Sequence, residues 1–451
     1  MAHLARRDFL KWSAAAAAAG LAAPRARLLA AQEPATVATA AATPALVVIF
    51  LRGGSDPLHM LLPWKDPEYL GGRSTLGLTE ADGIIPLDDT FALHPGLAPL
   101  KPAWDAKMLA PIVCAGSPHP TRSHFDAQDW MEFGAPGDRT ARAGWVNRYL
   151  GCTAKSGASE FRALGMQDLL PRSLRGDYPV LAVPTNLDRK SSGKTLDKFE
   201  DFYGDGSDML EGGEDMQGRR EDDDTGVVES GRMTIETLRR FQQIVGDSGS
   251  EGPGLGEDGG PRGNPRERAR AREERLAATA DPRGFPDSQF GRRMEVLSRV
   301  VSAGAGLEIA GLDYGGWDDH TNAGGADGKM AGRMGDLARG IAAFTTALGD
   351  RMAHTTILVM SEFGRTVREN GNNGTDHGHG GIMWVIGGGV KGGQIHGTWD
   401  GLGEQSLYQG RDLPVTTDYR DVYAAVLAQR FDFEAPKDFF PAHKPGKLRL
   451  F

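Results

Sequence analysis

The stretch Leu46-Val-Val-Ile-Phe-Leu-Arg-Gly-Gly-Ser-Asp56 carries the clearest signal of the fold. Its first six residues are all apolar, and a glycine-rich polar turn follows them directly. An uninterrupted apolar run of this length predicts a strand buried on both faces, as in the parallel sheets of α/β proteins. The polar turn lies at the carboxyl end of that strand, which is where such sheets place their binding sites.

Short apolar runs of the same kind recur along the chain, with amphipathic stretches between them. Two of those stretches, Met330–Leu348 and Asp418–Arg430, have the periodicity of helices that cover a sheet. This alternation predicts an α/β layer architecture with a mostly parallel sheet. The further strand candidates are Pro111–Ala115, Val180–Val183, Glu308–Asp313, Thr355–Met360 and Ile382–Ile386.

The composition limits the classes of protein to which the chain can belong. Of its 451 residues, 40% are hydrophobic and 25% are charged, which fits a soluble globular protein. A wholly disordered chain and a multi-span membrane protein are thereby excluded. The formal net charge of -9 argues against nucleic-acid binding, because no basic surface is available for phosphates. The two cysteines, Cys114 and Cys152, exclude a disulfide scaffold and could form one bridge or none.

The N-terminus has the features of an export signal. Residues 6–11 read Arg-Arg-Asp-Phe-Leu-Lys, the twin-arginine pattern, and an alanine-rich apolar region follows from Trp12 to Ala23. That region is too short for a permanent membrane anchor. The alternative interpretation of the segment is an ordinary alanine-rich helix that starts with a basic pair. We expect residues 1–42 to be a signal peptide with a short linker that engages the twin-arginine translocase, a route for proteins exported already folded. The mature chain, without an integral membrane span, is then periplasmic or extracellular.

Residues 43–451 are expected to form a single domain with one polar insertion. The insertion, residues 204–265, is acidic and becomes rich in glycine, proline and serine toward its end. Such a composition is typical of solvated, partly disordered segments. A helix candidate, Met233–Val245, lies inside the insertion, and a charged one, Arg266–Ala278, follows it.

Carboxylates, imidazoles and hydroxyls gather in the segments that follow the predicted strands. In open α/β sheets such segments meet at one edge and form the site. Carboxylate and imidazole groups are metal ligands, and Asp318 and His320 would face the same side of an extended segment. The segments are Arg52–Asp56, Thr121–Asp126, Gly315–His320, Ser361–Arg365 and Asp376–His379.

Several of these residues also fit a purely structural role. Asp56 fits a metal ligand or the polar residue of a tight turn. Ser123 fits a helix N-cap, with Asp126 completing a capping box, and the backbone amides of such a helix start could also hold an anion. Glu362 and Arg365 fit a structural ion pair as well as a site.

The polar segments together resemble an exported bacterial family catalogued as domain-of-unknown-function family 1501, which has no settled activity. This family is grouped with the alkaline-phosphatase-like and sulfatase-like superfamily. The resemblance implies an α/β/α sandwich with one or two divalent metals at the carboxyl ends of the strands. The matching stretches are Phe50-Leu-Arg-Gly-Gly-Ser-Asp56, Thr121-Arg-Ser-His-Phe-Asp-Ala-Gln128, Gly315-Gly-Trp-Asp-Asp-His320, Met360-Ser-Glu-Phe-Gly-Arg-Thr366, Asp376-His-Gly-His-Gly380 and Val415-Thr-Thr-Asp-Tyr-Arg-Asp421.

The resemblance also implies roles for individual residues. The attacking group would be the hydroxyl of Ser123, and Arg122 or Arg365 would hold the substrate anion. His124 completes the candidate catalytic set. The bound cofactor would be a divalent metal: zinc, manganese, calcium or iron. The implied metal ligands are Asp56, Asp318, His320, Glu362, Asp376, His377 and His379.

Two departures from the superfamily pattern bear on the activity. Phosphatases commonly have Asp-His where this chain has Glu362-Phe363. A formylglycine sulfatase needs a Cys-x-Pro/Ser-x-Arg motif, which the run Cys114-Ala-Gly-Ser-Pro118 does not supply. A sulfatase of that type is therefore not expected.

Two functional hypotheses follow from the sequence. The first is an exported metal-dependent hydrolase that acts on a phosphate or related ester in a small molecule or a polymer. The second is a non-catalytic metal-binding envelope protein that uses the fold for assembly or partner binding. In the second case the acidic insertion would be the interaction surface.

Overall fold

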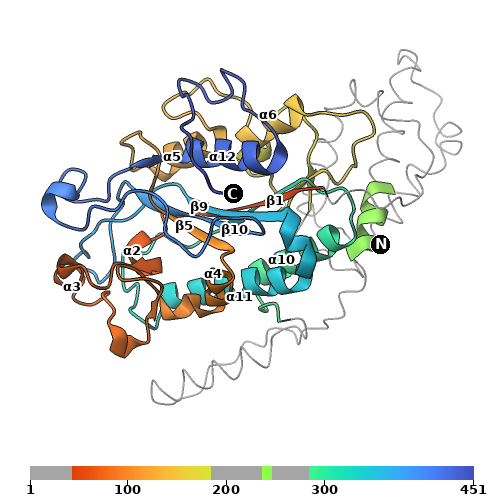
Figure 1. Ribbon diagram of the computed structural model, residues 1–451. Helices are drawn as coiled ribbons and strands as arrows, with labels where there is room; N and C mark the ends of the chain where they lie inside the picture. The colour runs from red at the N-terminus through yellow and green to blue at the C-terminus, as the bar shows by residue number, and fades with distance from the viewer. Residues whose placement is uncertain (1–42, 184–235, 246–283) are drawn as a thin grey trace, which may run out of the picture.

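The computed structural model describes residues 43–183, 236–245 and 284–451 (Figure 1). The signal peptide, most of the 204–265 insertion and the helix expected over Arg266–Ala278 lie outside the described residues. Residues 236–245 are helical, which confirms that part of the helix predicted over Met233–Val245. Cys114 is buried and Cys152 is exposed, and both are free thiols. Within the described ranges no helix is both long and apolar enough to cross a membrane.

One eight-stranded sheet forms the centre of the molecule, with strand order β11-β5-β10-β9-β1-β8-β6-β7. Its neighbouring strands pair in parallel except around β10, which runs antiparallel to both β5 and β9. Each of the six predicted strands overlaps a strand of this sheet. The strands are β1 (Ala45–Leu51), β5 (Leu109–Gly116), β6 (Ala163–Gly165), β7 (Leu181–Ala182), β8 (Ile309–Tyr314), β9 (Thr355–Ser361), β10 (Gly381–Gly387) and β11 (Thr417–Asp418).

Strand β1 is buried on both faces, as its unbroken apolar run predicts. Alternate side chains of a strand point to opposite faces of the sheet. Val47, Ile49 and Leu51 accordingly belong to one hydrophobic cluster, whereas Val48 and Phe50 belong to the other. Both neighbours of β1 are parallel strands, which places it in the interior of the sheet.

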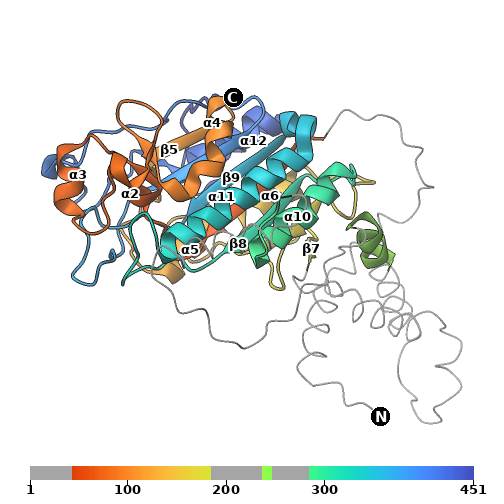
Figure 2. The same ribbon diagram turned by 90° about the horizontal axis from the view of Figure 1, so that it is seen from below.

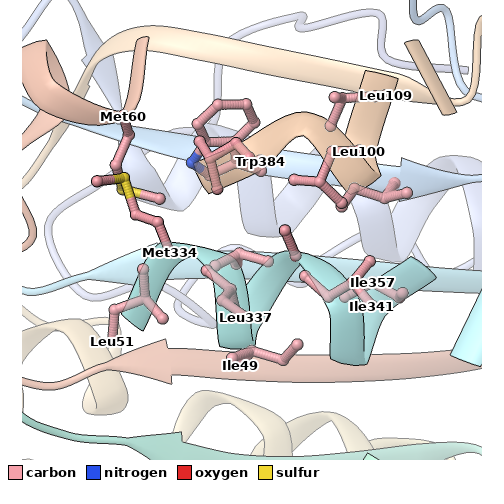
Figure 3. Close-up of a cluster of buried hydrophobic side chains, with 14 of the residues drawn as sticks. Ile49, Leu51, Met60, Leu100, Leu109, Met334, Leu337, Ile341, Ile357 and Trp384 are labelled. Carbon is pink, nitrogen blue, oxygen red and sulfur yellow. The ribbon is translucent and has the colours of Figure 1, made fainter. Parts of the chain in front are cut away.

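Helices cover both faces of the sheet, so the molecule is an α/β/α sandwich (Figure 1). One face carries α4 (Lys101–Asp105), α10 (Gln289–Ser302) and α11 (Lys329–Leu348). Figure 2 shows α10 and α11 side by side across that face, and Figure 3 shows Leu337 and Ile341 of α11 against the sheet. The other face carries α5 (His124–Phe133), α6 (Trp145–Cys152) and α12 (Tyr419–Phe431). Both helices predicted from periodicity, α11 and α12, are confirmed within one residue at each end.

Shorter elements complete the described fold. Two short helices, α2 (Pro57–Met60) and α3 (Pro67–Gly72), follow β1. A three-stranded sheet pairs in the order β2-β4-β3. Its strands are β2 (Leu61–Leu62), β3 (Ile85–Pro86) and β4 (Ala92–Leu93). The 3-10 helices are η2 (Glu80–Asp82), η3 (Pro95–Leu100), η4 (Arg172–Leu174), η5 (Gly349–His354) and η6 (Glu404–Ser406).

The sheet topology brings distant polar segments to a single edge. The parallel strands β1, β5, β8 and β9 end at the same edge, as expected for an α/β sheet. Because β10 runs in the opposite direction, it begins at that edge, and the segment 376–380 before it also arrives there. Backbone hydrogen bonds tie this segment to the turn after β9: Gly364 donates to His379 and Gly378 donates to Gly364. A Cβ at Gly364 would lie 1.9 Å from the carbonyl oxygen of Gly380, so this crossing requires glycine.

Candidate metal centre

Three side chains from different segments converge at this edge of the sheet. His124 is the first residue of α5, Asp318 follows β8, and His377 precedes β10. One ligand atom from each can be chosen so that all three lie within 4.8 Å of one another. Two imidazoles and a carboxylate at such spacing are a donor set that can hold a divalent metal.

Hydrogen bonds fix the orientation of two of these imidazoles. His124 Nδ1 lies 2.7 Å from Glu362 Oε1, and His377 Nδ1 lies 2.8 Å from the carbonyl oxygen of Arg122. A carbonyl or carboxylate oxygen can only accept, so each Nδ1 must carry the proton. In the neutral rings Nε2 therefore presents its lone pair, and both Nε2 atoms face Asp318. Metal-binding histidines in proteins are commonly held in this way.

The Nε2 atom of His124 provides a direct test of whether the residues suit a metal. This atom is buried, and among the described residues it has no hydrogen-bond partner. It lies 3.4 Å from Asp318 Oδ2. A buried polar atom without a partner is costly, and a metal ion would satisfy it. The residues therefore fit a bound divalent cation.

A third imidazole lies beside this group. His320 Nε2 is 2.9 Å from His377 Nε2 and 2.9 Å from Asp318 Oδ1. His320 Nδ1 lies 3.3 Å from Asp376 Oδ1, whose carboxylate also accepts from Asn370. With the proton of His320 on Nδ1, the two Nε2 lone pairs face each other and a cation between them would satisfy both; with the proton on Nε2, His320 donates to His377 or Asp318. His320 is thus placed to be a fourth ligand.

Glu362 is buried, and four donors surround its carboxylate. It accepts from His124 Nδ1, from Gln128 Nε2 at 2.8 Å, from the Gly53 backbone N–H at 2.9 Å and from the Ser361 hydroxyl at 3.1 Å. Burial by itself raises the pKa of Glu362, but these hydrogen bonds outweigh it and lower the pKa. Glu362, expected from the sequence to be a metal ligand, instead lies behind His124 and orients that ring.

Arg365 lies against Asp318 and lowers the pKa of its carboxyl group. Burial by itself raises the pKa of Asp318, but the hydrogen bond and charge of Arg365 outweigh it and lower the pKa to about 2. The hydrogen bond to Glu362 raises the pKa of His124, and burial lowers the pKa of His377. Asp318 is therefore an anion at neutral pH and His377 is neutral, which are the forms in which both bind metals.

The guanidinium of Arg365 is not available to a substrate anion, because its nitrogens already bond oxygens of the protein. It is buried and donates from Nε to Gly54 O at 2.6 Å, from one terminal nitrogen to Thr375 O, and from the other to Gly53 O, Trp317 O and Asp318. These bonds tie the turns after β1 and β8 to the turn after β9. The sequence suggested Arg365 as one of two residues to bind a substrate anion, whereas here Arg365 positions these turns.

Asp56 and His379, both expected as metal ligands, lie in other surroundings. Both Asp56 oxygens bond the buried Arg73 guanidinium, at 2.7 and 3.0 Å, and one also caps α2 through Leu58 N–H. Asp56 therefore fits the structural alternative better than the role of metal ligand, because the Arg73 guanidinium already pairs with its carboxylate. His379 is buried with its ring stacked on Tyr408, at a centroid distance of 4.2 Å.

Ser123 occupies the N-cap position of α5, but the expected capping box does not form. Its side chain is exposed and, in the part of the chain that the structure describes, makes no capping hydrogen bond. Asp126 instead pairs with Arg139 at 2.9 Å. The Ser123 hydroxyl is therefore accessible, next in the chain to His124.

Three partner residues were not predicted from the sequence: Gln128 beside Glu362, Arg73 beside Asp56, and Asp412 beside Arg122. Gln128 follows His124 by four residues, so the helical spacing alone could have shown that both face the same side of α5. Arg73 lies 17 residues from its partner Asp56, and Asp412 lies 290 residues from its partner Arg122. Neither has a local sequence signal, because only tertiary packing selects such pairs.

Comparisons with known proteins agree with part of this picture. Residues 265–438 match a family described as a protein of unknown function (DUF1501), and residues 3–23 match the twin-arginine translocation pathway signal sequence. The family match contains Asp318 and His377 but not His124. The signal match confirms the expected export route, so the protein is directed to the periplasm or beyond and the translocase takes part in its export. The wider superfamily stays a prediction.

Comparison with solved structures gives a distant likeness. One of them is titled "Crystal structure of Ps i-CgsB in complex with k-i-k-neocarrahexaose" and is 10% identical to this chain. The match covers 86% of this chain and 72% of that chain, with a TM-score of 0.32. No curated protein matches the sequence.

Proposed function

We propose that this protein is an exported metal-dependent hydrolase acting on a phosphate or related ester. The metal would be held by His124, Asp318 and His377, with His320 as a fourth ligand. The observation that carries the proposal is the buried Nε2 of His124, which has no hydrogen-bond partner among the described residues and lies 3.4 Å from Asp318 Oδ2. The Nδ1 of the same ring is held by Glu362, so Nε2 is the ring atom left to bind an ion.

The donor set favours zinc, manganese or iron over calcium. Imidazole nitrogens are ligands of transition metals, whereas calcium takes oxygen ligands almost exclusively. When bound, such an ion supplies Lewis-acid chemistry, polarising an ester oxygen and lowering the pKa of an attacking hydroxyl or water.

The residues of the chain would divide the remaining tasks. Glu362 and the Arg122 carbonyl orient His124 and His377, and Arg365 holds the Asp318 carboxylate in place. The exposed hydroxyl of Ser123, beside His124 at the start of α5, is the candidate nucleophile. Its position at the helix N-terminus also favours negative charge nearby.

Elemental analysis tests the metal site. Protein purified without chelators should contain nearly one equivalent of zinc, manganese or iron, and the Asp318→Ala/His320→Ala double variant should lose it. His354→Ala is the matched control, because it removes an exposed imidazole outside the site. A folded wild-type protein without metal would contradict the proposal.

Turnover tests the nucleophile separately. With metal-loaded protein and a panel of phosphate mono- and diesters, Ser123→Ala should abolish hydrolysis while leaving the metal content intact. Hydrolysis that persists in this variant would exclude a covalent step on Ser123. Stoichiometric metal without hydrolysis of any ester would instead support the non-catalytic envelope protein, for which deletion of residues 204–265 should abolish partner binding.

A further inference from the structure

We propose that the carboxyl end of β1 holds a second cation site, built from oxygens of Asp56, Thr366 and Val367, which the guanidinium of Arg73 fills permanently. The metal of the candidate centre then lies at the ligands around Asp318, with no second ion at Asp56. The oxygens of this second site belong to none of those ligands, so the inference goes beyond the proposed function and does not depend on it.

Four oxygens from three residues surround the guanidinium of Arg73. One terminal nitrogen donates to Asp56 Oδ2 at 2.7 Å, and the other donates to Asp56 Oδ1 at 3.0 Å and to the Thr366 carbonyl at 2.9 Å. Nε donates to the Val367 carbonyl at 2.9 Å. The side chains of Arg73 and Asp56 are only 1% and 0% exposed. The site is therefore enclosed, with a cation of the chain itself inside it.

The Asp56 carboxylate needs a cation because it is fully buried. A buried charge that loses its partner destabilises a protein strongly. Asp56 Oδ1 also accepts from the Leu58 N–H at 3.1 Å, and this bond caps α2 and fixes the carboxylate in the turn after β1. Arg73, at the end of α3, reaches back to Asp56 with two N–H groups. Such a two-bonded pair is the geometry in which guanidinium matches a carboxylate best.

No group of metal ligands includes Asp56 in the part of the chain that the structure describes. There, the one group of three histidine, cysteine or acidic side chains with ligand atoms within 4.8 Å of one another is His124, Asp318 and His377. His59, three residues after Asp56, is buried, and burial lowers its pKa to about 3, so its ring is neutral at neutral pH. A divalent ion at Asp56 would therefore share a single carboxylate with the Arg73 guanidinium.

The filled site also joins segments that carry the proposed metal ligands. The Thr366 N–H donates to the Asp376 carbonyl at 3.0 Å, and the Thr366 hydroxyl accepts from the Asp376 N–H at 3.1 Å. His377 comes next in the chain, and Arg365, which bonds Asp318, precedes Thr366. Because a chelator cannot remove a guanidinium that belongs to the chain, these segments stay joined in the metal-free protein.

A metal count tests whether a second ion binds at Asp56. Wild-type protein and Asp56→Asn, which removes the charge and keeps the shape, are incubated with excess zinc, manganese or calcium and freed of unbound ions. Elemental analysis should find the same number of equivalents in both proteins. One equivalent more in the wild type than in Asp56→Asn would overturn the proposal.

Chemical rescue tests the occupant of the site. Arg73→Ala should melt several degrees below the wild type, because the Asp56 charge is left buried alone. Millimolar guanidinium chloride, far below denaturing concentrations, should restore at least half of the lost melting temperature. The double variant Asp56→Asn/Arg73→Ala is the matched control and should not respond, since its site has no charge to balance. Absence of rescue, or equal rescue by sodium chloride or in the double variant, would overturn the proposal.

The outcomes keep the second cation site apart from the hydrolase. The metal count uses no Arg73 variant, so it decides the question even if Arg73→Ala fails to fold. Guanidinium rescue in a protein that binds no metal would support the second site while contradicting the proposed function. Metal-dependent hydrolysis by a protein that loses one of two ions in Asp56→Asn would overturn the second site and leave the proposed function standing.

Discussion

The candidate metal centre depends on which nitrogen of each imidazole carries the proton. The sequence showed that His124, His320 and His377 follow or precede strands of the sheet, and this placed them at one edge. It could not show that Glu362 would turn toward His124 rather than toward a metal, because that choice depends on donors from Gly53, Gln128 and Ser361. The residue types were predictable, whereas their partners come from tertiary packing.

Replacement of Glu362 by alanine should weaken metal binding without removing a ligand. Loss of a carboxylate that orients a metal-binding histidine costs about tenfold to hundredfold in affinity. Glu362→Gln, which keeps one oxygen acceptor, should lose less. Metal affinity measured by competition with a chelator checks this, with Glu369→Ala as a control carboxylate that bonds Ser74 and Thr75 instead. Complete loss of metal in both Glu362 variants would restore Glu362 as a direct ligand.

Replacement of Asp56 by alanine should destabilise the protein while leaving its metal content unchanged. The change leaves the Arg73 guanidinium buried without its counter-ion, at a cost of about 3–5 kcal/mol in the free energy of unfolding. Asp66→Ala is a close control, because Asp66 also caps a short helix that begins with proline but accepts from backbone N–H groups. That loss should be about 1 kcal/mol. Urea denaturation measures both, and metal loss at unchanged stability would identify Asp56 as a ligand after all.

At the scale of elements, the antiparallel direction of β10 determines which segment completes the site. The apolar run of β10 was predicted, but its direction was not, since a short apolar run looks the same in a parallel and an antiparallel strand. The reversal lets His377 reach the edge ahead of its strand. The glycines around it allow the backbone of 376–380 to lie directly on the turn after β9.

A side chain at Gly378 should displace His377. A Cβ at Gly378 would lie 2.5 Å from the backbone carbonyl of Arg365, closer than real Cβ atoms approach backbone. We expect Gly378→Ala to lower metal affinity at least tenfold. Gly371→Ala, in the same loop, is the control, because the Cβ there would meet no described atom within 4 Å. Circular dichroism confirms folding, and normal metal affinity in Gly378→Ala would contradict a role for this close crossing.

At the scale of the whole molecule, the sequence predicted the α/β sandwich because buried strands and amphipathic helices leave strong patterns. α10 was not predicted, although it packs closely beside α11 and carries buried residues such as Met294 and Leu297. The segments before it are charged and glycine-rich, and they obscure where the helix begins. The ion pair between Asp412 and Arg122 was not predicted either, because no residue near Asp412 in the sequence indicates that Arg122 packs against it.

The export signal makes a prediction for the whole chain. Arg6→Lys/Arg7→Lys should retain the protein in the cytoplasm, because the paired arginines are the feature that the translocase reads. Immunoblots of periplasmic and cytoplasmic fractions measure this, with Lys11→Arg as a charge-preserving control in the same segment. Unchanged export of the double variant would show that another pathway carries the protein.

The proposed metal ligand His124 and its orienting partner Glu362 come from distant parts of the sequence, so the site can form only in a complete, folded chain. His124 and Glu362, whose side chains bond each other, stand 238 residues apart in the sequence. A chain that is truncated between them, or whose two halves have not docked, cannot gather the imidazoles around one ion. If the metal is supplied before export, only a completely synthesised and folded chain would bind it.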